Sequence, residues 1–255
     1  MRKIIVASSK GGVGKSTVAL GVAAALNNLG KKVLLFDLDF ENKCLDLFLG
    51  AQDEVIFNIA DVAAGRVRAR RALLSDGRGL YFVASPDESE GETAPDVIAE
   101  ATERVIGETD VDFAVFDTGT AHGIPEALAR KYPDAEALVV ASHQSTSTRG
   151  AERTAKLLDG AGVSDSRLVI CGFDLKAAHA KQRNGILGII DDSKVPLIGA
   201  VPYDRELMLS HERGIRVKDS SPAAVAFRNI AKRILGEQVR LFDGIDSIDR
   251  KKIID

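Results

Sequence analysis

Short continuous runs of apolar residues recur along the chain and alternate with longer stretches in which apolar residues repeat every three or four positions. The runs are rich in Val, Ile and Phe, and their continuity predicts strands that are buried on both faces. The stretches between them predict helices that end at or beside a glycine. The expected strands cover residues 3–8, 32–37, 80–85, 112–117, 137–142, 167–173 and 196–201, and the expected helices include 16–29, 96–106 and 148–159.

This alternation of strand and helix predicts an α/β fold with a doubly wound, mostly parallel sheet that is flanked by helices on both faces. Ligands of such sheets bind at the carboxyl ends of the strands, and the motifs considered below all follow expected strands. We assign residues 1–236 to one domain and residues 237–255 to a C-terminal tail. The polar stretch 85–96 is expected to be a surface loop.

The composition favours a globular protein without a broadly basic surface, a disulfide framework or a membrane span. The 255 residues are 45% hydrophobic and 28% charged, which is enough for a large core, and the formal net charge of −3 does not favour a broadly basic surface for nucleic acid. Cys44 and Cys171 are far apart and show no metal-ligand spacing, so we expect a reducing cytoplasm and no disulfide framework. The first apolar run is too short for a signal peptide, and no apolar span reaches the roughly 18 residues of a membrane helix.

The loop after the first expected strand reads SSKGGVGKST and places three glycines between two lysines. A strand, a glycine-rich loop and a helix that opens at Lys15 form the context of a phosphate-binding loop, because backbone N–H groups and the helix N-terminus both favour an anion. A glycine turn without a ligand is the structural alternative. We expect Lys15 to reach the β and γ phosphates, Ser16 to ligate Mg²⁺ and Thr17 to contact the α-phosphate. The expected nucleotide-binding residues of this loop are Gly11, Gly12, Val13, Gly14, Lys15, Ser16 and Thr17.

The same loop departs from the common phosphate-binding pattern, because Ser9 stands at the first glycine position and Lys10 follows it. It resembles the deviant Walker A ATPases, whose loop reads (G/S)KGGxGK(S/T), and among them most of all the MinD family of septum-site-determining ATPases. The resemblance covers nearly the whole chain and implies a P-loop NTPase fold that binds ATP or ADP with Mg²⁺ and hydrolyses ATP. It also implies an ATP-dependent homodimer in which Lys10 reaches the nucleotide of the other subunit, so that Lys10 and Lys15 both act in catalysis.

Three aspartates follow expected strands and are candidates to complete the site. Asp37 and Asp39 come beside the glycine loop if the strands 3–8 and 32–37 are neighbours. The resemblance makes Asp39 a catalytic and metal-site residue that orients the attacking water, with a simple helix cap as the alternative. Asp37 is expected to support Mg²⁺ through water or through the loop backbone. Asp117 follows four apolar residues, the arrangement of a Walker B aspartate that holds Mg²⁺ through water.

Several neighbouring positions depart from the patterns of that family. In the stretch DFENKCLDLFLG, Glu41 and Cys44 stand where the family usually has Gly and Asn. Asp117 is followed by TGT, without the proline that is common there. After the strand 137–142 the family's Pro and Glu are absent, so Glu152 is expected either near the nucleotide at a dimer face or as a solvated helix charge.

Recognition of the base rests on the resemblance alone. It implies contacts at the end of the strand 167–173 and at a VPxD turn, and it favours ATP over GTP. The turn is present as Pro202, Tyr203 and Asp204, whereas Cys171 stands near the position of the family's asparagine. The four histidines show no metal-ligand spacing, and we expect surface or packing roles for His122, His143, His179 and His211.

The resemblance also implies partners. MinD family members bind the inner membrane through a basic amphipathic C-terminal helix, so the tail is a candidate weak membrane- or partner-binding segment, and the protein is expected in the cytoplasm or peripherally on the inner face of the membrane. The tail fits only in part, because acidic residues offset its basic ones. A regulatory protein partner is expected as well. The apolar stripe of the tail consists of Leu241, Ile245, Ile248 and Ile253.

Other positioning ATPases remain as alternatives. A DNA-partitioning or nucleoid-binding ATPase of the ParA type shares the loop, and so do ATPases that position flagella or pili. The one tight basic cluster contains Arg66, Arg68, Arg70 and Arg71. Apolar residues interleave with these arginines on what is expected to be a short helix, which is typical of a solvated face, so nucleic acid is not the expected partner.

Overall fold

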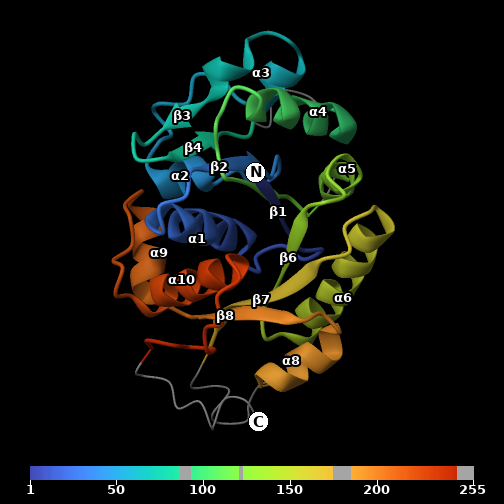
Figure 1. Cartoon of the computed structure of the whole chain (residues 1–255), viewed down its shortest axis with the longest axis vertical. Coiled ribbons are helices and arrows are strands. Elements are labelled where there is room, and N and C mark those ends of the chain that lie inside the picture. Colours follow the sequence, from blue (N-terminus) through green and yellow to red (C-terminus); the bar gives the residue numbers. More distant parts are fainter. Residues whose placement is uncertain (87–92, 121–122, 175–184, 246–255) are drawn as a thin grey trace.

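A mostly parallel sheet forms the centre of the molecule in the computed structural model, which describes residues 1–86, 93–120, 123–174 and 185–245. Its eight strands have the order β3-β4-β2-β5-β1-β6-β7-β8 (Figure 1). Among the described strand pairs, β3 with β4 is antiparallel and the others are parallel. The strands are β1 (Arg2–Ala7), β2 (Val33–Leu38), β3 (Leu74–Ser75), β4 (Leu80–Val83), β5 (Phe113–Thr118), β6 (Glu136–Ala141), β7 (Ser166–Phe173) and β8 (Leu197–Pro202).

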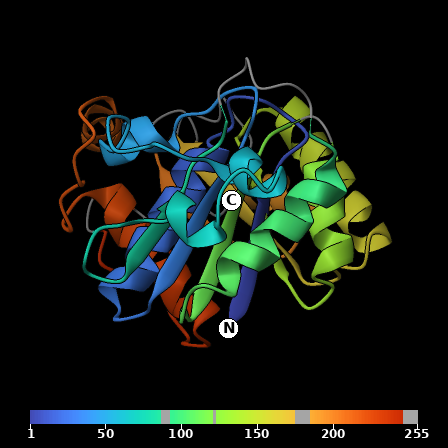
Figure 2. The same cartoon turned by 90° about the horizontal axis from the view of Figure 1, so that it is seen from above.

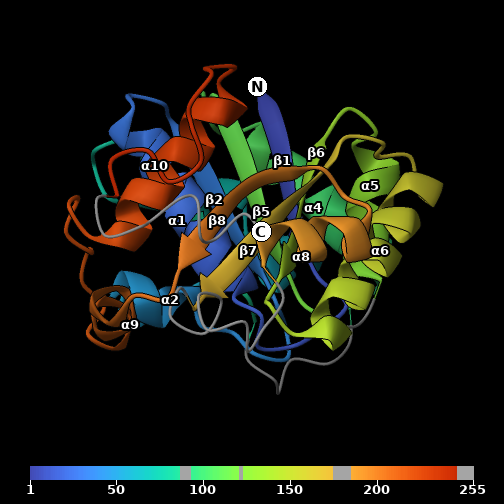
Figure 3. The same ribbon diagram turned by 90° about the horizontal axis from the view of Figure 1, so that it is seen from below.

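Helices cover both faces of this sheet, which confirms the predicted α/β fold. On one face α1 packs on β1, β2 and β5, and α10 packs on α1 and β8. On the other face α5 packs on β1, α6 packs on β6 and β7, and α4 packs on α5 (Figures 2 and 3). The helices are α1 (Lys15–Asn28), α2 (Leu45–Leu49), α3 (Ile59–Ala63), the 3₁₀ helix η1 (Ala69–Ala72), α4 (Pro95–Ile106), α5 (Ile124–Lys131), α6 (Ser145–Gly160), α8 (Ile186–Ser193), α9 (Arg205–Glu212) and α10 (Pro222–Ile234).

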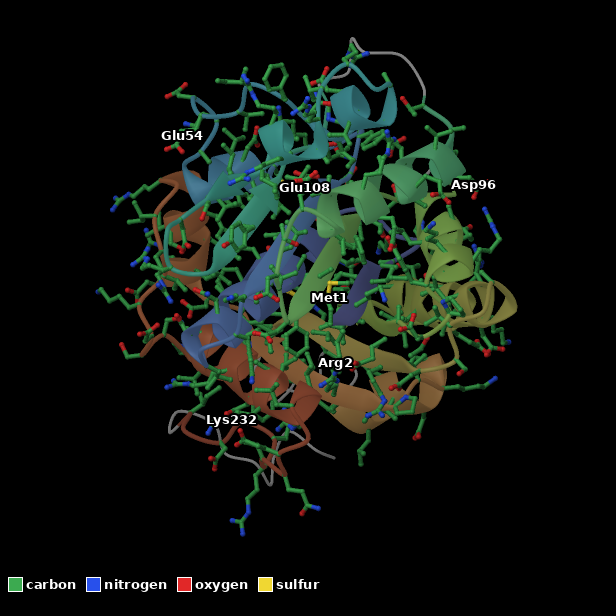
Figure 4. All side chains as sticks on the ribbon, turned by 45° about the horizontal axis from the view of Figure 1, so that its top comes forward. Met1, Arg2, Glu54, Asp96, Glu108 and Lys232 are labelled. Atoms are coloured by element: carbon green, nitrogen blue, oxygen red, sulfur yellow. The ribbon has the colours of Figure 1, made fainter. Side chains whose placement is uncertain are left out.

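The central strands are buried on both faces, as their apolar runs predict. Every residue of β2 and β5 is buried, including the aspartates near their carboxyl ends. Phe36 on β2 and Phe116 on β5 stack with ring centroids 5.1 Å apart, and Tyr132 stacks on Phe116 at 5.6 Å. Charged residues such as Glu54 and Asp96 lie exposed on the outside (Figure 4). The apolar surface removed from water by these strands is the main stabilising contribution to the fold.

The strand that leads into the glycine loop and the strand that ends at Asp37 are not neighbours. β5 lies between β1 and β2, and its Asp117 is paired in register with Val6 on one side and with Asp37 on the other. The prediction that strands 3–8 and 32–37 adjoin was therefore wrong. It relied on the tendency of consecutive strands to pair, whereas α1 crosses over β5 to join the two strands. The inserted strand places Asp117 between the glycine loop and Asp37.

The described part of the predicted tail packs against α10. Phe242 and Ile245 are only 3% and 6% exposed, and Asn229 on α10 donates from Nδ2 to the carbonyl oxygen of Asp243 at 2.7 Å. Ile245, one of the four residues of the expected apolar stripe, is thus covered. Ile248 and Ile253 lie outside the described residues, as do His122, His179 and residues 87–92 of the expected loop. Within the ranges described above, no helix is both long and apolar enough to span a bilayer.

The close approach of α10 to β8 depends on a glycine. A Cβ atom at Gly199 would lie 2.4 Å from Cγ1 of Ile230, which is fully buried on α10. Real Cβ atoms do not approach a carbon so closely, so this position excludes any side chain. The side chain of Ile230 on α10 therefore rests directly on the backbone of β8 at this point.

We expect Gly199→Ala to lower the free energy of unfolding by about 1–3 kcal/mol, because the added methyl group overpacks the contact between β8 and α10. Urea denaturation measures this change. Gly160→Ala is the matched control, since a Cβ at Gly160 meets no atom within 4 Å, and it should leave stability unchanged or slightly raised. A Gly199→Ala protein as stable as the parent would contradict the packing described here.

Candidate functional site

The loops that follow the parallel strands meet at one edge of the sheet, because parallel strands all end on the same side. The glycine loop follows β1, the loop of Asp39 follows β2, and residues 119–120 follow β5. The carboxyl ends of β6, β7 and β8 lie at the same edge. The motifs that follow the expected strands are therefore carried to one edge of the fold.

The glycine loop ends in an uncapped helix. Gly12 and Gly14 adopt left-handed conformations, with φ of 71° and 95°, that other residues rarely adopt. Gly14 is the N-cap of α1, no side chain caps this helix, and no acidic residue lies in its first turn. The backbone N–H groups and the helix dipole at this end are therefore available to an anion.

Ser9 anchors the start of the loop to α6. Its backbone N–H donates to Oγ1 of Thr154 at 2.9 Å, and its hydroxyl donates to the carbonyl oxygen of Gly150 at 3.0 Å. A Cβ at Gly150 would lie 2.9 Å from the Ser9 Oγ, so the serine and the glycine fit each other. These contacts give a structural reason for the serine that replaces the first glycine of the common motif. No local pattern in the sequence indicates Gly150 and Thr154, because their role depends on a contact about 140 residues away in the chain.

Lys15 and Asp39 face each other across the site. Lys15 is only 6% exposed, and its Nζ lies 3.8 Å from Oδ2 of Asp39, which is 4% exposed. Oδ1 of Asp39 accepts from the backbone N–H of Asn42 at 3.0 Å, whereas Cys44 is the N-cap of α2. The alternative interpretation of Asp39 as a helix cap was therefore wrong. A Cβ at Gly119 would lie 3.0 Å from Asp39 Oδ1, so the loops after β2 and β5 touch at this carboxylate.

Asp37 holds the loop backbone beside the site. Its Oδ1 accepts from the N–H of Asp39 at 3.1 Å, and its Oδ2 accepts from the N–H groups of Cys44 at 3.3 Å and Leu45 at 3.1 Å. Burial raises the pKa of Asp37 to about 7, although these hydrogen bonds act in the opposite direction. Asp37 thus fixes both the start of the loop and the first turn of α2.

Asp117 is a buried carboxylate without an ion-pair partner among the described residues. It is fully buried, and neither of its oxygens has a described hydrogen-bond partner in good geometry. Burial, followed by the nearby Asp37, raises its pKa well above the usual value, while the adjacent Ser16 hydroxyl and the charge of Lys15 lower it. A buried carboxylate in this state is costly unless a cation compensates it.

These residues fit a magnesium ion. Ser16, Asp39 and Asp117 are the candidate metal-site residues, and the unpartnered carboxylate of Asp117 is the group that calls for a cation. Within the described part of the chain, no cluster of three or more His, Cys, Asp or Glu side chains is arranged as a metal cage. This agrees with Mg²⁺, which keeps several waters and takes phosphate oxygens as ligands rather than a full set of protein side chains.

Cys44 lies beside this site. Burial raises the pKa of its thiol to about 12; the hydroxyl of Ser16 lowers that pKa, and the carboxylates of Asp37, Asp117 and Asp39 raise it further. The thiol therefore stays protonated at neutral pH. Cys44 contributes its backbone N–H to the network of Asp37, and this part of its role does not depend on the side chain.

Lys10 contacts its own chain in this structure. Its Nζ donates to Oε1 of Gln144 at 2.5 Å and to Oγ1 of Thr146 at 2.8 Å. Gln144 is the N-cap of α6, and Thr146 lies in the first turn of that helix. The two lysines of the loop thus point to different surroundings, since Lys15 is buried beside Asp39 and Lys10 lies on α6.

The predicted base-recognition residues have distinct environments. Tyr203 is 61% exposed, while Asp204 caps α9 by accepting from the N–H of Glu206 at 2.9 Å and also accepts from the N–H of Ala223 on α10 at 3.1 Å. Cys171 lies behind the glycine loop, where its Sγ is 2.7 Å from the position of a Cβ on Gly14. Cys171 therefore supports the loop through packing.

Glu152 and two arginines of the basic cluster have partners within the chain. Glu152 accepts from Lys156 at 2.9 Å and from Lys194 at 3.1 Å, which links α6 to the end of α8. In the arginine cluster, Arg66 pairs with Asp61 at 2.6 Å, and Arg71 lies over the ring of Phe57 at 5.2 Å. The expected short helix is η1, whose Ala69 and Ala72 are buried. These contacts are those of solvated surface charges.

Comparison with known proteins identifies relatives along the whole chain. The sequence matches the family described as CobQ/CobB/MinD/ParA nucleotide binding domain over residues 4–217. It is 30% identical to the septum site-determining protein MinD of Synechocystis over 95% of this chain and 92% of that protein. The fold is similar to MinD in the MinC:MinD complex of Aquifex aeolicus, with a TM-score of 0.84 and 27% identity over 94% of this chain and 98% of that one. It is also similar to Pyrococcus horikoshii MinD complexed with Mg-ADP, with a TM-score of 0.79 and 24% identity over 91% and 95%.

We expect Asp117→Asn to raise the free energy of unfolding of the metal-free protein by about 1 kcal/mol or more, because it removes an unpartnered buried carboxylate. The same change should abolish the dependence of nucleotide affinity on Mg²⁺. Urea denaturation in the presence of a chelator measures the first effect, and calorimetric titration with ATP measures the second.

Asp46→Asn is the matched control. Asp46 is also buried, but it has partners in Lys43 at 3.1 Å and in the N–H of Leu47 at 2.8 Å. This change should therefore lower stability and leave the Mg²⁺ dependence intact. If Asp117→Asn were less stable than the parent without metal, Asp117 would not be the unmet charge of this site.

Proposed function

Because the chain belongs to the CobQ/CobB/MinD/ParA family of nucleotide-binding domains, we propose that its strand-end site works as the switch of an ATP-dependent homodimer. The chain is a MinD-type P-loop ATPase with a role in the placement of the cell-division site, and its cofactors are ATP or ADP and Mg²⁺. The observation that carries the proposal is the pair of loop lysines, one buried beside Asp39 and one held outside on α6.

The phosphates bind at the start of α1. Gly12 and Gly14 turn the backbone so that its N–H groups face the anion, and Lys15 neutralises the β and γ groups. Ser16 and Asp117 would hold Mg²⁺, the aspartate through water, and the ion would supply positive charge to the phosphate oxygens. Thr17 contacts the α-phosphate. The unpartnered carboxylate of Asp117 supports this arrangement, since a cation is what it lacks.

Hydrolysis requires a water molecule aligned with the terminal phosphate. We assign this orientation to Asp39, whose carboxylate lies 3.8 Å from the Lys15 ammonium and whose backbone N–H donates to Asp37. Orientation by one carboxylate and charge stabilisation by lysines are the main requirements of phosphoryl transfer. A single protomer lacks the second lysine at its phosphates, so turnover is slow until two copies meet.

The dimer forms when Lys10 exchanges partners. In the single chain its ammonium is held by Gln144 and Thr146. In the dimer, Lys10 of each copy reaches the phosphates of the other, where an ion pair with a triphosphate replaces two hydrogen bonds to neutral groups. Release of Lys10 also frees the start of α6 and changes the surface that a regulatory partner meets. Nucleotide state is thereby converted into partner binding.

A regulatory protein partner is the second part of the proposal, as in the MinC:MinD complex of Aquifex aeolicus. We place the protein in the cytoplasm or on the inner face of the membrane. The tail from residue 237 is a candidate for contact with a membrane or a partner, but Ile245 of its apolar stripe is buried against the domain, so membrane contact requires residues beyond it or a release of this packing.

The adenine base is expected beside the turn of Pro202, Tyr203 and Asp204. The exposed ring of Tyr203 is available to pack on a base, and Asp204 keeps the turn in place through its contacts with α9 and α10. Cys171 acts indirectly, by supporting Gly14 from behind. Selection of ATP over GTP therefore depends on the backbone and on Tyr203.

Two substitutions around Lys10 should act in opposite directions. Lys10→Ala should abolish ATP-dependent dimerisation with a smaller loss of ATP binding by the single chain. Gln144→Ala should lower the ATP concentration needed for half-maximal dimerisation by about twofold to tenfold, because it weakens the contact that competes with the dimer. Light scattering at a series of ATP concentrations measures both.

The control for these variants is Lys32→Ala. Lys32 is an exposed lysine that pairs with Asp110 at 3.1 Å, far from α6 in the sheet order, and its loss should leave dimerisation unchanged. Dimerisation that persists in Lys10→Ala would remove the basis for the exchange of partners.

Asp39→Ala should separate assembly from turnover. Without the carboxylate, ATP hydrolysis is expected to fall at least about 100-fold, while the ATP-bound dimer accumulates and persists. Single-turnover phosphate release and light scattering on the same sample test the two halves of this expectation. If Asp39→Ala hydrolysed ATP at the normal rate, Asp39 would not be the group that orients the attacking water.

A further inference from the structure

A cavity of about 570 Å³ opens on the side of the sheet that carries α1 and α10, at the end of α1 away from the glycine loop. Its walls come from the second half of α1, the end of α2, α9 and the segment after it, α10, and residues next to β4. Ligand sites of proteins have volumes in this range and are mainly apolar with a few polar groups. None of the residues that line it belongs to the nucleotide site described above.

The floor of the cavity is apolar and aromatic. Phe48, Leu80 and Phe227 line it, and His211 stacks on Phe48 with ring centroids 4.1 Å apart and an angle of 13°. Burial lowers the pKa of His211 to about 4, so the imidazole is neutral at physiological pH and presents an aromatic face rather than a charge. A hydrophobic body of a ligand fits against these four side chains.

The rim is more positive than negative. Three arginines and two aspartates line it. Arg78 pairs with Asp76 at 3.6 Å, and Arg228 donates to the backbone carbonyl of Asp219 at 3.1 Å. Among the described residues Arg216 has no ion-pair or hydrogen-bond partner, and it is exposed beside the cavity. Its guanidinium is therefore available to an acidic group.

We propose that this cavity binds a small amphipathic anion, with an apolar body against Phe48, Leu80 and Phe227 and a carboxylate or phosphate at Arg216. The chemistry of the walls selects such a ligand over a neutral or cationic one of the same shape. This site is separate from the nucleotide site and goes beyond the proposed ATPase switch.

The cavity is linked to the nucleotide site through the helices that form its walls. α1 begins at Lys15 in the glycine loop, and α2 begins at Leu45, whose N–H donates to Asp37. α9 begins after Asp204, in the turn expected beside the base. Three helices that start at the nucleotide site thus meet at the cavity, so a ligand that shifts them has a direct mechanical path to the phosphates.

Two glycines let the segments after α2 and α9 pack closely together. A Cβ at Gly50, which follows α2, would lie 2.5 Å from the carbonyl oxygen of Gly214, which follows α9, and a Cβ at Gly214 would lie 2.5 Å from Cα of Gly50. This direct contact of backbones packs the end of α2 against the end of α9. We infer that occupation of the cavity and binding of nucleotide affect each other.

The probe for the site is anilinonaphthalene sulfonate, an aromatic anion that fluoresces in apolar surroundings, titrated into the nucleotide-free protein and displaced by decanoate, decanol or decyltrimethylammonium. Saturable binding of one probe per chain is expected, with decanoate displacing it about tenfold more tightly than decanol. Equal displacement by all three, or preference for the cation, would overturn the proposal.

Two variants test the walls. Arg216→Gln should remove the preference for decanoate and leave decanol unchanged, whereas Arg213→Gln, at an exposed arginine that does not line the cavity, should change neither. Ala24→Phe fills the cavity from α1 and should abolish saturable probe binding while the circular dichroism of the folded protein is retained. A probe that binds Ala24→Phe as before, or Arg216→Gln with the full preference, would overturn the assignment.

Titration with the probe in the presence of saturating Mg-ATP tests the link between the sites. The affinity for the probe should change about fivefold, and the affinity for ATP should change by the same factor when decanoate is present, since binding linkage is reciprocal. An unchanged affinity would overturn the link. Probe binding to the nucleotide-free chain does not require hydrolysis, so its failure and the failure of the proposed ATPase switch are distinguishable.

Discussion

The placement of charge at the carboxyl edge of the sheet depends on one constraint, the burial of Asp117 between β1 and β2 without a partner among the described residues. A buried carboxylate of this kind destabilises the fold until a cation reaches it. In the proposed function, this cost is offset when Mg²⁺ and a nucleotide bind beside Asp117.

The residues around Asp117 position the loops of the site. Asp37 is satisfied by backbone N–H groups and keeps the loop after β2 in shape, which leaves Asp39 free to face Lys15. Ser9 fixes the start of the glycine loop to α6. The loops after β1 and β2 are thus each held by hydrogen bonds that do not involve the expected phosphate-binding atoms, and a ligand meets a geometry that already exists.

Helices that begin at the proposed nucleotide site connect it to two distant surfaces. The contact of Lys10 with Gln144 and Thr146 connects the glycine loop to α6 on one side of the sheet. On the other side, α1, α2 and α9 run from the nucleotide site to the cavity lined by Phe48 and His211. Each route starts at the loops of the proposed nucleotide site, so a change in nucleotide state has a structural connection to both surfaces.

The sequence by itself determined the fold class, the seven strands with long apolar runs and the phosphate-binding loop, because apolar periodicity and glycine spacing are local properties of the chain. Only the tertiary structure decided that β5 separates β1 from β2, that Gly150 accommodates Ser9, that Cys171 lies behind Gly14 and that Lys10 rests on Gln144. The short strand β3 was missed for the same reason that these contacts were. They depend on which distant segments pack together, and that is set by the balance of burial over the whole sheet rather than by any local pattern.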